Sequence, residues 1–351
     1  MPALRVRTTL LRATALRTLA GAVALTAGLT AGLTACGGNG SSSASDAVTA
    51  GNAAKGTVTV GALSNGAARQ TDLAVPVVPS IRAELPEQIR NKGQLVIGVG
   101  ALPAGFAPLA FVGSDQRTLT GSEPDLGRLV AAVLGLTPVV RNSTWENLFV
   151  GIDSGRTDVG FSNITDTEER KRKYDFASYR QDNVAFEVLS TSTWKFTGGY
   201  ESLAGRTVAV GSGTNQEKIL LEWKAKLRTE GKDLTVKYFP DANSTYLALS
   251  GHKIDAYFAP NPDVEYHAAK DAGTPGATRN AGTYSGAGAT LQGLIAATSK
   301  KGSGLAKPVA DALDYLIRNG QYGKWLAAWN LSNEAVPASR INPPGLPLTN
   351  S

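Results

Sequence analysis

Cysteine and histidine are scarce in this chain of 351 residues. Cys36 is its single cysteine, so no disulfide can form within one molecule. His252 and His267 are its two histidines, and neither belongs to a Cys/His pattern with the spacing of a metal site. The sequence also lacks a phosphate-binding loop and a Ser-His-Asp set with a nucleophile elbow. These absences argue against a metalloenzyme, a P-loop enzyme and a serine hydrolase, and we expect no metal and no cofactor.

Acidic residues are absent from the first 35 positions, which carry four arginines and then an uncharged stretch from Thr18 to Ala35. A basic start followed by a short apolar segment is typical of a secretory signal. A membrane span is the alternative, but this stretch is short and weakly apolar for one. Residues 33–36, Leu-Thr-Ala-Cys, resemble the bacterial lipobox. We therefore expect a lipoprotein signal peptide over 1–35 and a lipid anchor at Cys36, holding the protein on the extracytoplasmic side of the cell membrane.

Positive charge is not concentrated elsewhere. Removing the four arginines lowers the formal net charge from +6 to +2. The other basic residues are interspersed with acids, apart from the run Arg170–Lys173, so no nucleic-acid surface is predicted. We expect lipid anchor and flexible linker over 36–79, because the segment begins with Gly, Ser, Ala and Asn; Thr57–Leu63 could form a short strand.

Strand and helix patterns alternate from residue 80 onward. The buried strand Gln94–Val99 precedes apolar residues at helical spacing over 126–136, and another strand and helix follow. The same order returns in the second half, from Leu203–Val210 to Ile254–Phe258. This alternation predicts an α/β protein with mainly parallel sheets, in which ligands bind at the carboxyl ends of strands.

A polar stretch follows the short strand Val159–Phe161. Thr167 precedes Arg170 by three residues with two glutamates between them, a pattern that predicts an N-cap and an acidic first helical turn. Free backbone N–H groups and a guanidinium together suit a carboxylate. A capped surface helix with a solvated arginine is the alternative. A second helix start, at Gly211–Gln216, follows the strand Leu203–Val210 and could also receive an anion or a small polar group.

These patterns together resemble the extracellular solute-binding proteins of ABC importers, in the polar amino-acid-binding family (family 3), over roughly residues 80–335. The matching motifs are Leu95-Val-Ile-Gly98, Phe106-Ala-Pro108, Leu119-Thr-Gly121, Gly155-Arg-Thr-Asp158, Thr167-Glu-Glu-Arg170, Tyr174-Asp-Phe176, Gly213-Thr-Asn-Gln216, Ile254-Asp-Ala256 and Gly320-Gln-Tyr-Gly-Lys-Trp325. The resemblance implies a two-lobed, periplasmic-binding-protein-like (type II) α/β fold with two hinge strands. Lobe 1 would comprise 80–189 and 293–335, lobe 2 would comprise 190–292, and 336–351 would be a C-terminal tail.

The resemblance also implies a ligand site. Arg170 would pair with the ligand α-carboxylate, and Thr165 would hydrogen-bond to it. Phe106 and Trp145 would form apolar walls around the ligand side chain. The other expected contacts are Ser162, Asn163, Thr214, Asn215, Gln216 and Asn261.

Some positions depart from the family pattern. Ala259-Pro260-Asn261 stands where an acid commonly receives the ligand ammonium, so Asn261, Asp263 or Glu123 would have to substitute. The loop between Gly98 and Phe106 carries no acid, which argues against a strongly basic ligand. An amino acid, an amino-acid derivative and another small carboxylate stay open as ligands.

The resemblance implies a monomeric binding component, not an enzyme, that captures an amino acid or related carboxylate and delivers it to a membrane permease. One alternative is a dehydratase of a cyclic carboxylic acid on the same scaffold, which would need a positioned acid or base such as Glu123. The other is an extracellular ligand-sensing protein.

Overall fold

The computed structural model describes residues 56–349. The predicted signal peptide, Cys36 and the first part of the predicted linker lie outside the described residues. No helix within the described range is long and apolar enough to span a membrane.

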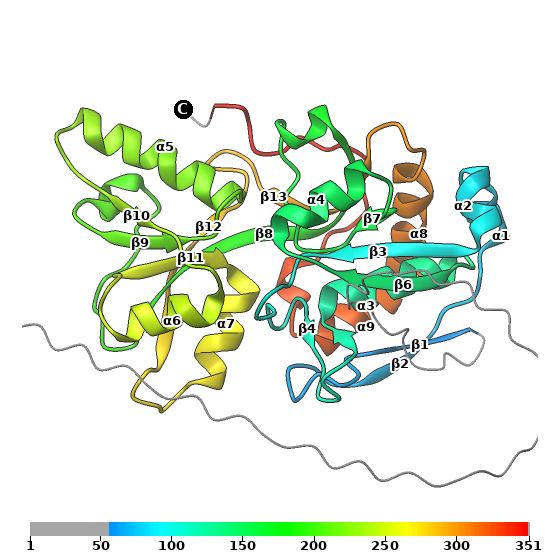
Figure 1. Cartoon of the computed structure of the whole chain (residues 1–351), viewed down its shortest axis with the longest axis horizontal. Helices are drawn as coiled ribbons and strands as arrows, with labels where there is room; N and C mark the ends of the chain where they lie inside the picture. The colour runs from blue at the N-terminus through cyan, green and yellow to red at the C-terminus, as the bar shows by residue number, and fades with distance from the viewer. Residues whose placement is uncertain (1–55, 350–351) are drawn as a thin grey trace, which may run out of the picture. The chain divides into compact units, whose positions relative to one another are not determined.

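Two α/β lobes share one sheet through the strand β8 (Tyr174–Leu189), which is 16 residues long and runs through both (Figure 1). In lobe 1 it pairs antiparallel with β13 (Gly293–Lys300), and in lobe 2 with β11 (Ala256–Pro260) and β12 (Thr278–Ser285). The chain therefore passes between the lobes along β8 and again from β12 to β13. The predicted two-lobed α/β fold with two connecting strands is confirmed.

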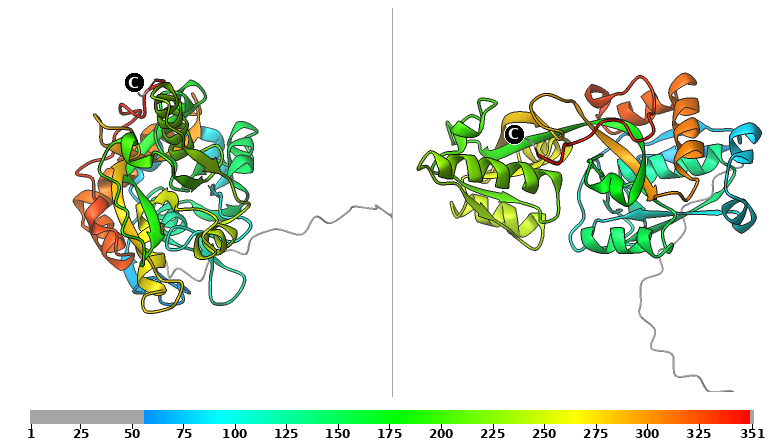
Figure 2. Two further views of the ribbon diagram at one scale, coloured as in Figure 1. Left: turned by 90° about the vertical axis from the view of Figure 1, so that its left-hand side faces the viewer. Right: turned by 90° about the horizontal axis from the view of Figure 1, so that it is seen from above.

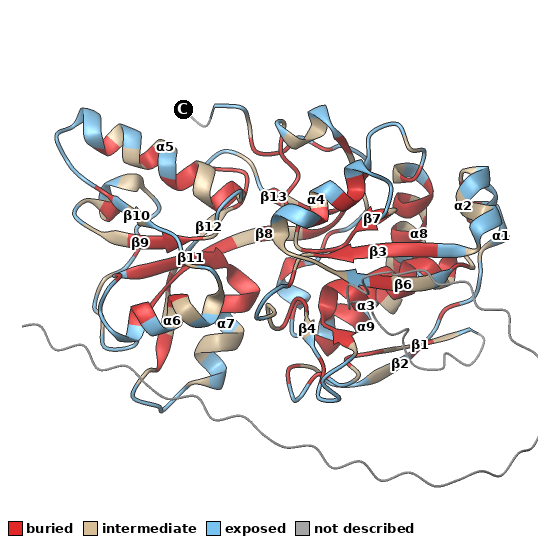
Figure 3. Cartoon of the chain, viewed as in Figure 1, coloured by how far each residue is buried: buried red, intermediate tan, exposed pale blue. Residues whose placement is uncertain are grey.

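Lobe 1 is built on the strand β3 (Gln94–Val99), which pairs in parallel with β6 (Thr137–Asn142) and β7 (Val159–Gly160). Five of the six residues of β3 are buried, since helices cover both faces (Figure 3). The helices of this lobe are α1 (Pro79–Ala83), α2 (Glu87–Lys92), α3 (Ser122–Val133), α4 (Trp145–Asp153), α8 (Ala306–Arg318) and α9 (Gln321–Ala328). A separate ribbon pairs β4 (Phe111–Val112) with β5 (Leu119–Thr120).

Lobe 2 repeats this arrangement around β9 (Thr207–Val210). This strand pairs in parallel with β10 (Thr235–Lys237) and β11. Its helices are α5 (Asn215–Thr229), α6 (Ala242–Ser250) and α7 (Asn261–Lys270). One apolar core of this lobe contains Phe186, Trp223 and Phe258, and the other contains Tyr257 and Val264.

The segment before residue 80 contains a hairpin of β1 (Thr57–Val60) and β2 (Thr71–Ala74). Its apolar residues Val58, Val60 and Leu73 are buried in the core of lobe 1. The Gly61 N–H donates to Asp125 Oδ2 at 2.7 Å, which ties the hairpin to α3. Within the described part, residues 57–74 are therefore folded structure and not linker, because their alternating apolar side chains find a partner surface on α3 and α9.

The predicted helix after Thr167 is wrong. Thr167 Oγ1 accepts the Arg170 N–H at 3.1 Å as a cap would, but only a 3-10 turn, Arg170–Arg172, follows. The chain then enters β8 at Tyr174, which leaves no room for a longer helix. This position does not offer a helix N-terminus to an anion.

The end of the chain, residues 340–348, forms what we call the C-terminal strap. The Ser178 N–H donates to the Arg340 carbonyl at 3.0 Å, and the Leu346 N–H donates to the Asp166 carbonyl at 3.2 Å, both in lobe 1. The Leu346 side chain lies in a core cluster of lobe 2, and Lys218 Nζ on α5 donates to the Leu348 carbonyl at 2.9 Å. Figure 2 shows this red segment passing from one lobe to the other.

Candidate functional site

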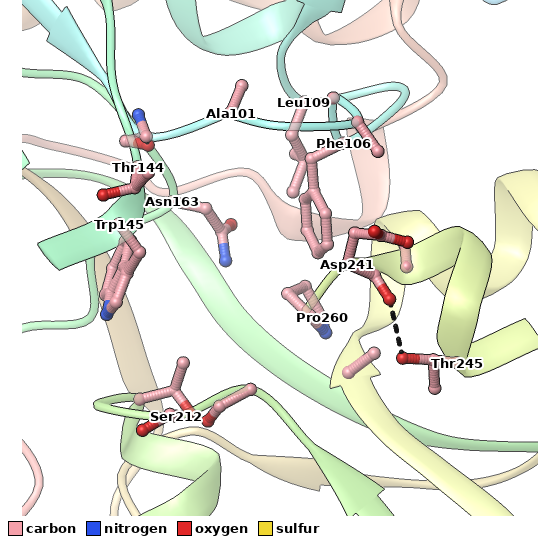
Figure 4. A pocket seen from close by; sticks show the side chains of 18 of the residues that line it. Ala101, Phe106, Leu109, Thr144, Trp145, Asn163, Ser212, Asp241, Thr245 and Pro260 are labelled. Carbon is pink, nitrogen blue, oxygen red and sulfur yellow. Dashed lines mark hydrogen bonds between the residues drawn. The ribbon is translucent and has the colours of Figure 1, made fainter. Parts of the chain in front are cut away.

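A cavity of about 350 Å³ lies between the lobes, and its walls follow the carboxyl ends of parallel strands. Gly100 follows β3, Ser162 follows β7, Gly211 follows β9 and Pro260 ends β11. The fold therefore gathers loops from both lobes at one place, where α/β proteins bind ligands. We call this space the ligand cavity (Figure 4).

Most of the residues predicted from the sequence line the ligand cavity. They are Phe106, Trp145, Ser162, Asn163, Thr214, Asn215 and Gln216. Thr165, Arg170 and Asn261 are not among its lining residues. Direct contact of these three with a ligand stays a prediction.

Phe106 and Trp145 stand on the lobe 1 side of the cavity, with Asn163 between them in the view of Figure 4. Phe106 sits in a tight loop closed by two backbone hydrogen bonds with Ala110, at 2.6 and 2.8 Å. Trp145 is the first residue of α4, whose N-cap Thr144 accepts the Asn147 N–H at 3.3 Å. Both rings are therefore positioned by local backbone structure and can pack against a ligand side chain.

Asn163 adopts a left-handed backbone conformation with φ of 52°. Its Oδ1 accepts from Arg180, and its N–H donates to Glu123 Oε2 at 2.9 Å. No hydrogen bond within residues 56–349 uses Nδ2, and Figure 4 shows this nitrogen directed into the cavity. Asn163 can therefore donate to a ligand oxygen.

Glu123 lines the cavity but is already engaged. Its Oε1 lies 3.1 Å from Arg180 Nη2, and its Oε2 also accepts from the Tyr179 hydroxyl. Glu334 pairs with Arg180 Nη1, and the side chains of Glu123, Arg180 and Glu334 are at most 1% exposed. Although burial opposes the charge, the two glutamates raise the pKa of Arg180. This buried cluster is a structural support for Asn163, and it leaves Glu123 without a free oxygen for acid–base chemistry.

Arg170 does not line the cavity, but it lies against Trp145, which does. Its Nη1 donates to the Thr165 carbonyl at 2.9 Å, and its Nη2 donates to the Gly213 carbonyl of lobe 2 at 3.2 Å. Its guanidinium carbon is 5.3 Å from the Trp145 ring centroid and 5.4 Å from that of Phe149. Burial lowers the pKa of Arg170 to about 10, so the side chain keeps its charge at neutral pH.

Asp182, on β8 between the lobes, accepts hydrogen bonds from the side chains of two predicted site residues, Thr165 and Asn215. Its Oδ2 accepts from Thr165 Oγ1 at 2.7 Å and from Asn215 Nδ2 at 3.2 Å. Burial raises the pKa of this carboxyl group. The side chain of Thr165 is thus turned to an internal carboxylate, which explains its absence from the cavity wall.

Lobe 2 supplies the N-terminus of α5. Thr214 caps this helix, and its Oγ1 accepts the Glu217 N–H at 3.1 Å. The backbone N–H groups of Asn215 and Gln216 make no hydrogen bond within residues 56–349 and lie at the cavity wall. Two free N–H groups at the positive end of a 15-residue helix suit a carboxylate.

Asn261 and Asp263, two of the predicted substitutes for an ammonium acceptor, lie away from this cavity. Asn261 begins α7, where its Oδ1 accepts from Asn280 Nδ2 at 3.0 Å. Asp263 accepts from the Tyr246 hydroxyl at 3.1 Å, and burial raises the pKa of Asp263 to about 8. Asn261 instead lines a second, smaller cavity together with Trp329 and Glu334.

Two acids that were not predicted also line the cavity, Asp241 and Glu146. Asp241 caps α6, and its Oδ1 accepts the Ser244 N–H at 2.8 Å. An aspartate directly before a helix and shortly after a strand is a recognisable N-cap in sequence. The position of Asp241 near the carboxyl end of β10 could therefore have been predicted from the sequence. Its closeness to lobe 1 could not.

Residues 97–332 match the family of bacterial extracellular solute-binding proteins, family 3. The chain belongs to this family. The L-cystine-binding protein TcyJ of Escherichia coli (strain K12) is 29% identical over 172 residues, which is 49% of this chain and 60% of TcyJ. The arginine-binding protein ArgT of Corynebacterium glutamicum is 27% identical over 267 residues, covering 76% of this chain and 83% of ArgT.

Solved structures of such proteins share the fold. AbpA of Streptococcus pneumoniae, bound to L-arginine, has a TM-score of 0.59 at 20% identity and covers 70% of this chain and 99% of its own. The ancestral amino-acid-binding protein AncCDT-1, a precursor of cyclohexadienyl dehydratase, has a TM-score of 0.57 at 22% identity, with 69% and 97% covered. At these identities the likeness establishes the type II fold alone.

Proposed function

We propose that the protein is the extracytoplasmic substrate-binding component of an ABC importer, which holds an amino acid between its lobes and delivers it to a membrane permease. The observation that carries this proposal is the ligand cavity, which combines aromatic walls from lobe 1 with a free helix N-terminus from lobe 2 in a family 3 solute-binding fold. In this proposal the protein acts as a monomer and is anchored through lipid on Cys36.

The ligand α-carboxylate faces the first turn of α5 in this proposal. The N–H groups of Asn215 and Gln216 donate to it, and Asn163 Nδ2 donates from lobe 1. Arg170, which lies against Trp145, contributes positive charge. Arg170 Nη2 and Trp145 Nε1 of lobe 1 both donate to the Gly213 carbonyl of lobe 2 at 3.2 Å. These two hydrogen bonds join the lobes next to the proposed position of the ligand carboxylate. A ligand that binds between the lobes favours the closed population, which the permease then recognises.

Ligand-dependent thermal unfolding tests the proposal. The protein from residue 37 onward is titrated with amino acids, their derivatives and small carboxylates that lack an ammonium group. A ligand at about a hundredfold over its Kd stabilises the native state by about 2.7 kcal/mol, which raises the melting temperature by several degrees. We expect such a rise with an α-amino acid, and mass spectrometry should recover that ligand unchanged.

Two outcomes would contradict the proposal. No shift with any amino acid would remove amino-acid binding as the function. Conversion of the ligand would instead show an enzyme, such as the dehydratase alternative, although Glu123 already uses both of its carboxylate oxygens in the buried cluster.

A further inference from the structure

The charged residues of the ligand cavity are all acidic. Glu123, Glu146 and Asp241 line it, and no Lys, Arg or His is among the lining residues within 56–349. Arg170 directs two of its nitrogens to the carbonyls of Thr165 and Gly213. A ligand with net negative charge would therefore meet carboxylates without a cation in the cavity wall.

One carboxylate oxygen of Asp241 can accept a hydrogen bond from a ligand. One carboxylate oxygen, Oδ1, caps α6 by accepting the Ser244 N–H. The other, Oδ2, has no hydrogen-bond partner within residues 56–349. Figure 4 shows Asp241 beside Phe106, on the side of the cavity away from Trp145 and Ser212. It thus lies at a distance from the N-terminus of α5, where the α-carboxylate is proposed to bind.

The uncharged part of the wall also suits a cation. Phe106, Trp145, Phe239 and Tyr257 line the cavity from both lobes. Aromatic faces attract guanidinium and ammonium groups, and the attraction grows when water is excluded. A long side chain can therefore pass along these rings before its charged end reaches a carboxylate.

We propose that the ligand is an amino acid with a cationic side chain, whose terminal guanidinium or ammonium group pairs with Asp241 Oδ2. This inference rests on the proposed function and names the substrate class of the same cavity. It replaces the expectation from the sequence that a strongly basic ligand is disfavoured, which considered only the loop between Gly98 and Phe106. The acid comes instead from lobe 2, at the start of α6.

The substitution Asp241→Asn separates this role from helix capping. Asparagine caps a helix about as well as aspartate, so the fold and the Ser244 contact should be kept while the charge is removed. Asp233→Asn is the matched control, because it removes the same charge from lobe 2 at an exposed residue that does not line the cavity. Melting temperatures of both ligand-free variants should equal that of the parent.

Isothermal titration of the full chain with L-arginine, L-lysine and L-citrulline provides the measurement. Citrulline has nearly the shape of arginine without its charge. We expect arginine or lysine to bind at least about tenfold more tightly than citrulline, because a closed cavity strengthens charge pairing. Asp241→Asn should lower the affinity for the basic ligand by about tenfold or more and leave that for citrulline within about twofold. Asp233→Asn should change either affinity by less than about twofold.

The outcomes that overturn the inference differ from those that overturn the proposed function. Equal binding of citrulline and arginine, or an unchanged arginine affinity in Asp241→Asn, would show that Asp241 is only a helix cap. Binding of neutral amino acids alone would reject the cationic class and keep the importer proposal. Absence of binding for every amino acid would reject both.

Discussion

Arg170 joins the two lobes from the lobe 1 side. It donates to the Gly213 carbonyl oxygen, the same atom to which Trp145 Nε1 donates, and its guanidinium lies against the rings of both Trp145 and Phe149. Gly213 has φ of +71°, which a glycine adopts without strain, and this conformation directs its carbonyl to both donors. A single carbonyl thus couples the closure of the lobes to the turn that precedes α5.

We predict that Arg170→Ala lowers ligand affinity by about tenfold or more, since it removes an interlobe hydrogen bond and a charge beside the proposed carboxylate position. Isothermal titration with the amino acid found in the thermal panel measures this effect. Arg172→Ala is the matched control, because Arg172 is an exposed neighbour, and its affinity should match that of the parent. If Arg170→Ala binds as tightly as the parent, Arg170 contributes neither to closure nor to carboxylate recognition.

At the scale of elements, the β1–β2 hairpin is fixed to lobe 1 through Asp125. This buried carboxylate accepts from the Gly61 N–H at 2.7 Å and from Trp329 Nε1 at 3.1 Å, and it pairs with Arg128 at 2.7 Å. Burial raises the pKa of Asp125. One side chain on α3 therefore organises the hairpin and the segment after α9.

Asp125→Ala should lower the free energy of unfolding by about 3–5 kcal/mol, because it leaves the buried Arg128 charge without its carboxylate. Urea unfolding followed by circular dichroism measures this change. Asp72→Ala is the comparison within the hairpin: Asp72 is exposed and, within residues 56–349, its side chain accepts only from Thr59, so its loss should cost about 0.5 kcal/mol or less. Equal stability of the two variants would show that the hairpin is not anchored through Asp125.

The sequence predicted those elements whose apolar residues repeat with a clear period. The helix predicted over 126–136 corresponds to α3, and the helix start predicted at Gly211–Gln216 corresponds to the start of α5, which follows the Thr214 cap. The sequence indicated a possible strand at Thr57–Leu63, which contains β1, but not its pairing with β2, because both strands have four residues and gain their burial from α3 and α9. The helix after Thr167 was wrong because a cap pattern fixes only the first turn and does not reveal that β8 begins at Tyr174.

The candidate site was predictable to the extent that it depends on strand ends. Phe106, Trp145 and Asn163 each follow a strand of lobe 1, so a general rule for α/β folds places them near the cavity. Asp241 faces them only because β8 carries lobe 2 opposite lobe 1. The arrangement of the lobes depends on contacts far apart in the chain, which local periodicity does not encode. Arg170 shows the same limit, because its carbonyl partner Gly213 lies 43 residues away.

At the scale of the whole described region, the C-terminal strap adds a further connection between the lobes. The backbone of Leu346 is bonded to Asp166 and Glu168 in lobe 1, while its side chain is buried in a lobe 2 core. The strap also bonds to lobe 1 through Asn342, which accepts the Phe176 N–H at 2.8 Å. Opening of the lobes must therefore move or stretch this segment.

Leu346→Ala should lower the free energy of unfolding by about 2–5 kcal/mol, the usual cost of truncating a buried leucine. Leu348→Ala is the control two residues away: Leu348 is 49% exposed, and its truncation should change stability by about 0.5 kcal/mol at most. Denaturant unfolding compares the two variants. A loss for Leu346→Ala no larger than that for Leu348→Ala would show that the strap is not held by the lobe 2 core.

The position of Leu346 also bears on the order in which the protein can be made. Lobe 1 begins before β3 but is completed by β13, α8 and α9, and lobe 2 takes a core side chain from residue 346 of 351. A chain that emerges N-terminus first therefore cannot complete the core of lobe 1 before α9 is free, nor that of lobe 2 before Leu346 is free. Each lobe therefore stays incomplete until segments far along the chain have been added to it.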